Sequence, residues 1–288
     1  MRWSKRREAF RALFAGDRCV HPGSVFDPLS ARIAEEVGFE AGMFAGSVAS
    51  LTVLGAPDVI VLTLSEFAGQ AYRINRAAEL PLMVDADHGY GNALNVTRTV
   101  EELEAAGVAG LSIEDTLLPQ PFGAHDKTQL ISLEEGAGKM RAALAGRRDP
   151  ALMVVGRTSA VSVTGVDDAC RRIAAYEAAG VDALFLIGVK TRAQLESLRA
   201  AVKLPLILGG AGPEITDLDY LSGMGVRLCL QSHAPFMAAV QAVYDTLKAL
   251  REGTAPKDLK GVAPGDLMKR LTRDGDYQAW MQDFLGGK

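Results

Sequence analysis

Residues 82–92 read LMVDADHGYGN, and this stretch passes from apolar residues to two carboxylates within two positions. We interpret it as a buried strand that ends in a polar site. Residues two apart in an extended strand point to the same face, so Asp85 and Asp87 would aim the same way at the carboxyl end of the strand. The glycines that follow would let the chain fold back closely.

Two like charges so placed need a counter-charge. A divalent cation with oxygen ligands would provide it, most simply Mg2+ that keeps several of its waters. The alternative is that the two aspartates only cap the next helix or a turn. The stretch by itself leaves both interpretations open.

From about residue 18 onward, the chain repeats a short apolar run, a loop with glycine, aspartate or proline, and a longer segment with helical periodicity. This pattern predicts a repeated βα unit. Besides the opening stretch, the predicted strands lie at 19–21, 41–44, 110–114, 152–156, 183–187, 204–208 and 227–231. Eight units in one unbroken series favour an α/β fold of the (β/α)8 TIM-barrel type, in which the chemistry lies on the loops after the strands.

The pattern also predicts two domains. Residues 1–252 would form the catalytic barrel with an N-terminal helix, and residues 253–288 a C-terminal helical tail. An apolar face outside a finished barrel usually packs on something, so the tail is expected on its own barrel or on a neighbouring subunit. Residues 116–131 carry proline, glycine and polar residues without periodicity, which predicts a long loop, and such loops often act as lids.

Composition limits the partners. The 288 residues are 48% hydrophobic and carry a net charge of -4, which gives no long-range attraction for nucleic acid or for an anionic membrane. The three cysteines, Cys19, Cys170 and Cys229, are far apart, as is typical of reduced thiols in a cytoplasmic protein. No apolar run has the length of a signal sequence or a membrane span. We expect a cytoplasmic protein with a small-molecule partner.

Polar residues gather at the carboxyl ends of the predicted strands. They are Ser47, Asp85, Asp87, Glu114, Arg157 and His233, with Asp58 and the backbone amide of Gly46 nearby. The acidic groups would hold a cation directly or through its waters, while Arg157 and the amides of Gly46 and Ser47 would bind an oxyanion. An α-keto acid fits such a site, because its carboxylate and keto oxygens chelate a metal that then acts as a Lewis acid. Each residue alone also has an ordinary explanation: Arg157 as an ion-pair partner of Glu114, and His233 as a helix-capping or core histidine.

Four segments carry a family resemblance. PGSVFDPLSAR at 22–32, DADHGYGN at 85–92, GLSIED at 110–115 and GRT at 156–158 resemble the phosphoenolpyruvate mutase/isocitrate lyase superfamily. The resemblance implies a (β/α)8 barrel that acts on bonds next to an enolpyruvate unit. It implies Mg2+, with Mn2+ as the alternative, bound directly at Asp85 and mainly through water at Asp58, Asp87 and Glu114. It also implies a homotetramer in which a C-terminal helix is exchanged between neighbouring barrels.

Departures from the superfamily pattern narrow the reaction. The isocitrate and methylisocitrate lyases carry a lid with a proton-handling cysteine, whereas residues 119–125 read PQPFGAH, and the lysine and asparagine of the phosphonopyruvate mutases are absent too. Loss of CO2 from oxaloacetate needs no base. FAGSVAS at 44–50, LLP at 117–119 and SHA at 232–234 are most similar to the oxaloacetate decarboxylase branch, whose substrate contacts map onto Ser47, Arg157 and His233.

We therefore expect an enzyme, a carboxy-lyase that converts oxaloacetate to pyruvate and CO2 through an enolate stabilised by Mg2+ and Arg157. His233 would donate a proton, bind the departing carboxylate or stabilise the enolate oxygen, and the sequence leaves these roles open. One alternative is another α-keto acid lyase of the same superfamily, cleaving methylisocitrate-like or phosphonopyruvate substrates. The other is a barrel that binds a keto acid and a metal without turnover.

Overall fold

The computed structural model describes residues 3–124 and 128–286. The chain forms two compact units, Met1–Ser232 and His233–Lys288. Residues 125–127 of the predicted 116–131 loop, including His125, lie outside the described residues. The domain boundary expected after residue 252 stays a prediction.

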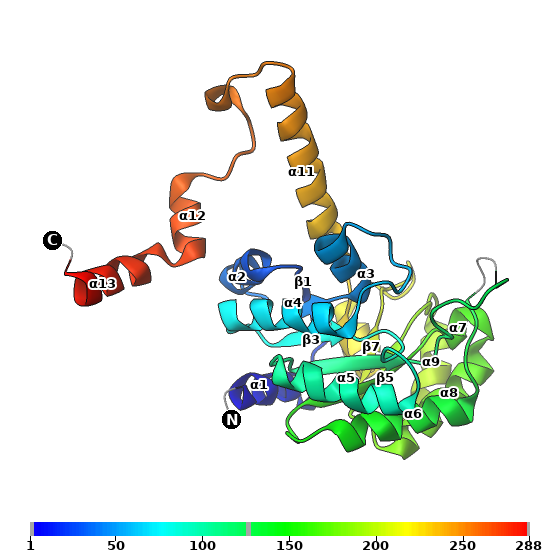
Figure 1. The fold of residues 1–288 in the computed structure, drawn as a ribbon. Coiled ribbons are helices and arrows are strands. Elements are labelled where there is room, and N and C mark those ends of the chain that lie inside the picture. Colours follow the sequence, from blue (N-terminus) through cyan, green and yellow to red (C-terminus); the bar gives the residue numbers. More distant parts are fainter. Residues whose placement is uncertain (1–2, 125–127, 287–288) are drawn as a thin grey trace. The chain divides into compact units, whose positions relative to one another are not determined.

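The first unit is built on one sheet of eight parallel strands, in the order in which they occur along the chain (Figure 1). The strands are β1 (Gly23–Ser24), β2 (Gly42–Phe44), β3 (Leu82–Asp85), β4 (Gly110–Glu114), β5 (Met153–Thr158), β6 (Ala183–Leu186), β7 (Leu206–Leu208) and β8 (Val226–Cys229). A parallel bridge between Val20 and Leu228 joins the chain just before β1 to β8. The predicted (β/α)8 barrel is confirmed.

Helices follow the strands on the outside of the sheet (Figure 1). They are α2 (Pro28–Glu36), α3 (Gly46–Ala49), α4 (Leu64–Ala77), α5 (Ala93–Ala105), α6 (Leu133–Gly146), α7 (Ala160–Val163), α8 (Val166–Ala179), α9 (Arg192–Ala201) and α10 (Leu218–Gly223), with a π-helix at Ser50–Leu54. Helices α2, α4, α5, α6 and α9 begin with side-chain caps. In α4, for example, the Thr63 hydroxyl and the Glu66 carboxylate each accept a backbone N–H of the other residue. The short helices α3, α7 and α10 and the π-helix were not expected from periodicity, because one or two turns carry too little pattern.

The barrel interior is apolar and is closed at the end where the strands begin. Met83, Val155 and Phe185 belong to this inner cluster, together with Phe10 of α1 (Ser4–Ala15). A Cβ on Gly110, the first residue of β4, would lie 2.6 Å from the Phe10 ring, so α1 packs against the amino-terminal end of the strands. The opposite, carboxyl-terminal end is therefore the one available for chemistry.

The second unit consists of α11 (Ala234–Arg251), a short 3-10 turn (Pro256–Asp258), α12 (Gly265–Thr272) and α13 (Asp274–Leu285). None of the residues of α11 is buried. Its exposed residues Met237, Val240, Tyr244 and Leu247 recur at spacings of three and four, which places them along one face of the helix. Within residues 3–124 and 128–286, no helix combines the length and the apolarity that a membrane span requires.

Candidate active site

Asp85 is the last residue of β3 and is buried, with 8% of its surface exposed. Its Oδ1 accepts a hydrogen bond from the Ser112 hydroxyl at 3.1 Å and one from the Asp87 N–H at 3.2 Å. Its Oδ2 forms a hydrogen-bonded ion pair with Nη1 of Arg157. Strands β3, β4 and β5 therefore each contribute to the position of this carboxylate.

The turn after β3 brings Asp87 onto Gly46. Asp87 has a positive φ of 47°, and its carbonyl accepts the N–H of Glu114 at 2.9 Å. A Cβ on Gly46 would lie 2.5 Å from Oδ2 of Asp87, so the carboxylate packs directly against this glycine at the start of α3. Burial, followed by the charges of Asp85 and Glu114, raises the pKa of Asp87 well above its usual value.

Glu114 and Arg157 are paired in register at the ends of β4 and β5. Nε of Arg157 lies 3.2 Å from Oε2 of Glu114, close enough for an ion pair although not aligned as a hydrogen bond. Burial and the charge of Asp85 raise the pKa of Glu114, against the lowering effect of Arg157. Burial alone would lower the pKa of Arg157, but Asp85 and Glu114 hold it above its usual value, so the guanidinium stays charged.

Asp58 completes the acidic group. It lies at the surface, in the segment between the π-helix and α4. The partial burial of its carboxyl group, followed by the charge of Asp85, raises its pKa. Arg157 thus lies among four carboxylates, and repulsion between them adds to burial in raising the pKa values of Asp58, Asp87 and Glu114. A divalent cation would relieve this repulsion, and the donors are all oxygens, as Mg2+ prefers.

The acidic group does not form a ready-made cage. In the described part of the chain, no three histidine, cysteine, aspartate or glutamate side chains lie close enough together to ligate one ion directly. Mg2+ commonly binds through one or two carboxylates and keeps several waters. The donor set therefore fits a hard divalent cation held partly through water.

Ser47 and His233 differ in how they are placed. Ser47 is half-buried in α3 and follows Gly46, which contacts Asp87, so it lies beside the acidic group. His233 precedes α11 and belongs to the second unit. Its predicted role stays a prediction.

The structure adds two residues that the sequence argument missed. Ser112 lies two residues before Glu114 on β4, so the alternation of strand side chains alone would place both on one face. The hydroxyl of Tyr90 is buried and has no hydrogen-bond partner among the described residues. Burial, then the charges of Asp87 and Asp85, raises the pKa of Tyr90, which keeps its proton available as a donor beside the carboxylates.

Comparison with known proteins agrees with this geometry. A family model described as phosphoenolpyruvate phosphomutase matches residues 10–251. The chain is 59% identical to a protein named oxaloacetate decarboxylase from Bradyrhizobium diazoefficiens, over 288 residues and 100% of both chains. It is also 59% identical, over the same length and coverage, to a protein of that name from Rhodopseudomonas palustris.

Solved structures of related enzymes share the fold. A phosphoenolpyruvate phosphomutase from Streptomyces platensis subsp. rosaceus matches with a TM-score of 0.87 and 29% identity, covering 97% of this chain and 99% of that one. A phosphonopyruvate hydrolase in complex with oxalate and Mg++ matches with a TM-score of 0.86 and 28% identity, with the same coverage. An oxaloacetate acetylhydrolase in complex with 3,3-difluorooxalacetate matches with a TM-score of 0.86 and 29% identity, covering 99% and 98%. The chain therefore belongs to the phosphoenolpyruvate phosphomutase family.

Proposed function

We propose that this protein is an oxaloacetate decarboxylase, a carboxy-lyase that releases pyruvate and CO2. The observation that carries the proposal is the position of Arg157, whose guanidinium is ion-paired with both Asp85 and Glu114 at the carboxyl ends of the strands. A permanent cation at this place suits an enolate oxygen or a carboxylate. The full-length relatives named oxaloacetate decarboxylase support the choice of substrate.

We propose Mg2+ as the cofactor, with Mn2+ as the alternative. Asp85 would bind it directly, and Asp87, Glu114 and Asp58 mainly through water. The fit rests on the all-oxygen donor set and on the burial, with added repulsion between carboxylates, that raises the pKa values of Asp87 and Glu114. A divalent cation bound there would supply Lewis acidity toward the keto oxygen of the substrate.

The reaction requires little proton transfer by the side chains of the protein. The C3–C4 bond of oxaloacetate breaks, C4 leaves as CO2, and the bonding electron pair passes into the pyruvate enolate, which is then protonated at C3. Arg157 and the Ser47 hydroxyl would hold substrate oxygens and stabilise the enolate. His233 would contribute either the proton or a hydrogen bond to an oxygen.

The test is pyruvate release from oxaloacetate with and without Mg2+, with an EDTA control and a protein-free Mg2+ control for the spontaneous reaction. The proposal expects a rate far above free Mg2+ that EDTA abolishes and that Asp85→Asn removes. A rate equal to that of free Mg2+, or an unchanged rate in Asp85→Asn, would refute it.

A second reaction on the same substrate deserves a direct comparison, because an oxaloacetate acetylhydrolase is among the similar structures. Decarboxylation cleaves C3–C4 and yields pyruvate, whereas hydrolysis of C2–C3 yields oxalate and acetate. Product analysis separates the two, and phosphonopyruvate and methylisocitrate in the same panel cover the other lyase alternatives. Oxalate binding without turnover of any keto acid would favour the non-enzyme alternative.

We also propose the homotetramer, with α11 packed on the barrel of another copy. The apolar face of α11 is at least half exposed at Met237, Val240, Tyr244 and Leu247. The barrel unit carries two cavities that share His21, of about 460 and 370 Å3, and their linings include apolar residues such as Leu221, Val37 and Phe39. Sedimentation should show a tetramer that the double substitution Val240→Asp, Leu247→Asp dissociates and that Gln241→Glu, on the polar face, leaves intact. A wild-type monomer would refute the assembly.

We place the protein in the cytoplasm. Its three cysteines are free. Burial raises the pKa of Cys19 to about 12 and that of Cys229 to about 11, so both stay protonated and unreactive. Fractionation of the cells that produce the protein would test this assignment.

A further inference from the structure

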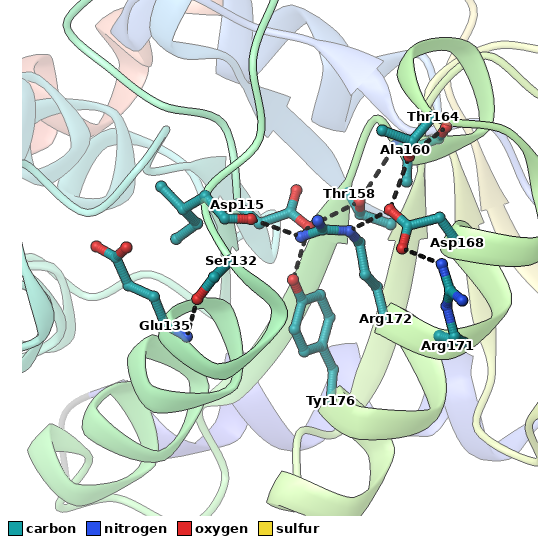
Figure 2. A network of polar contacts seen from close by, with 11 residues as sticks. Asp115, Ser132, Glu135, Thr158, Ala160, Thr164, Asp168, Arg171, Arg172 and Tyr176 are labelled. Atoms are coloured by element: carbon teal, nitrogen blue, oxygen red, sulfur yellow. Dashed lines mark hydrogen bonds and ion pairs between the residues drawn. The ribbon is translucent and has the colours of Figure 1, made fainter.

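Asp115 follows Glu114 in the sequence but turns to the opposite side of the strand. It is fully buried, and its Oδ2 accepts three hydrogen bonds (Figure 2). The donors are the Thr158 hydroxyl at 2.9 Å, Nη1 of Arg172 at 2.9 Å and the Tyr176 hydroxyl at 2.6 Å. Arg172 and Tyr176 lie on α8, so this network joins β4 and β5 to the helix that covers them.

The network lies directly behind the candidate active site. Glu114 and Arg157 are neighbours in register, and each is followed by a residue of the network, Asp115 and Thr158. Since successive side chains of a strand point to opposite faces, the ion pair occupies one face of the β4–β5 pair and the Asp115–Thr158 hydrogen bond occupies the other. A shift in the rear pair would move the front pair with it.

Arg172 also fixes the segment between β4 and α6 at its base. Its Nη1 donates to the Ile131 carbonyl at 3.0 Å, and the Ile131 N–H donates to the carbonyl of Asp115 at 2.9 Å. One step further out, the Leu117 N–H donates to the Gln129 carbonyl at 2.8 Å. The start and the end of the segment are thus joined at Asp115.

We infer that Asp115, Arg172 and Thr158 are positioning residues for Arg157: they hold β4 and β5 at the spacing at which the guanidinium reaches both Asp85 and Glu114. None of the three is catalytic. In its kinetic consequence, the inference rests on the proposed decarboxylase function.

Two neighbouring arginines provide a matched pair of variants. Arg171 and Arg172 both form ion pairs with Asp168. In the described part of the chain, Arg172 also forms an ion pair with Asp115, and Arg171 does not. Arg172→Met should lower kcat/KM for oxaloacetate by about tenfold to hundredfold, because small displacements of a substrate-binding group have effects of that size. Arg171→Met should stay within about twofold of wild type, as an exposed ion pair contributes little.

Conservative variants guard against a folding defect. Thr158→Val removes the hydroxyl at nearly constant volume, and Tyr176→Phe keeps the ring that packs on Gly156. Both should lower kcat/KM in the same direction while thermal unfolding shows the folded state intact at the assay temperature. In a protein that already carries Arg157→Lys, the further change Thr158→Val should lower kcat/KM by less than about threefold, because the effects of coupled residues are not additive. Full additivity would overturn the inference and indicate a general loss of structure.

A readout that needs no turnover separates the two proposals. Phenylglyoxal modifies accessible guanidinium groups, and the adduct at Arg157 is quantified by peptide mass spectrometry against other arginines of the same sample. Arg157 should react several times faster in Thr158→Val and Arg172→Met than in wild type and Arg171→Met. Equal reactivity in all four proteins overturns the inference. If the wild type released no pyruvate, the decarboxylase proposal would fail while this comparison still decided the positioning role.

Discussion

Ser112 donates its hydroxyl to Asp85 across the β3–β4 pair, with 3.1 Å between Oγ and Oδ1. The two residues are partners in the strand register, and the Ser112 carbonyl accepts the N–H of Ala86 at 3.1 Å. Ser112 is itself fully buried. The orientation of the proposed metal-binding carboxylate is therefore fixed by the neighbouring strand as much as by its own.

Ser112→Ala should weaken Mg2+-dependent activity. Loss of a hydrogen bond to a charged group costs about 1.5–3 kcal/mol, which corresponds to about tenfold to hundredfold in kcat/KM if Asp85 loses its orientation. A Mg2+ titration of the rate measures the effect, and the half-saturating concentration should rise. Ser197→Ala, at an exposed serine that bonds the Ala193 carbonyl within α9, serves as the control. An unchanged titration would remove Ser112 from the site.

Gly46→Ala should disrupt the position of Asp87. The new Cβ would lie 2.5 Å from the carboxylate, closer than such contacts occur, so Asp87 or the start of α3 must move. We expect at least about a hundredfold loss of kcat, the scale of a 1 Å misplacement.

Gly69 provides the matched control. It lies in α4, where an added Cβ would meet no atom within 4 Å. Gly69→Ala should retain activity and raise stability by about 0.5–1 kcal/mol, because alanine is favoured over glycine inside a helix. Equal activity of the two alanine variants would contradict the packing of Asp87 on Gly46.

Arg157→Ala should reduce kcat by about 10² to 10³, the usual effect of removing a donor that stabilises an oxyanion. It also leaves Asp85 and Glu114 without their ion-pair partner, so Mg2+ should stabilise the variant against unfolding more than it stabilises the wild type. Thermal unfolding with and without Mg2+ measures this second effect. Arg98→Ala, whose partners Glu101 and Glu102 lie on the surface, should match the wild type in both assays.

His88 makes stability depend on pH. Burial, followed by the charge of Lys139, lowers the pKa of His88 from 6.5 to about 4. As pH falls, the His88 side chain of the unfolded chain takes up a proton before that of the folded chain. The full free energy of unfolding is therefore present above about pH 6.5, and it falls progressively toward pH 4. The loss amounts to about 3 kcal/mol.

Comparison with His88→Asn isolates this contribution, since the carboxylates titrate alike in both proteins. The free energy of unfolding, measured by urea between pH 7 and pH 4, should fall more steeply for the wild type by the amount stated. Parallel curves would show that His88 is not buried as a neutral base.

Much of the candidate site was predictable because the sequence pattern that marks the end of a buried strand is local. Asp85 and Glu114 end buried apolar runs, and parallel strands bring such ends to one rim, so their meeting with Arg157 followed from pattern alone. The opposite faces of Glu114 and Asp115 also follow from the period of two along a strand.

Other features depend on residues that are distant in sequence. Nζ of Lys139 donates to the His88 carbonyl at 2.8 Å, and the two residues are 51 positions apart. The sequence around either residue does not predict this hydrogen bond. The positive φ values of Asp87 and Tyr90 likewise arise from tertiary packing, since neither residue type prefers them as glycine does. The helices of a single turn fall below the length at which periodicity is informative.

The bridge between Val20 and Leu228, which joins the two ends of the sheet, has a consequence for the biosynthesis of the barrel. The Val20 N–H donates to the Arg227 carbonyl and the Cys229 N–H donates to the Val20 carbonyl, each at 3.0 Å. Val20, just before β1, thus acquires this neighbour only after more than two hundred further residues have left the ribosome. Until then the growing chain exposes unpaired strand edges at both ends of its sheet, which is the state most open to aggregation and to chaperones.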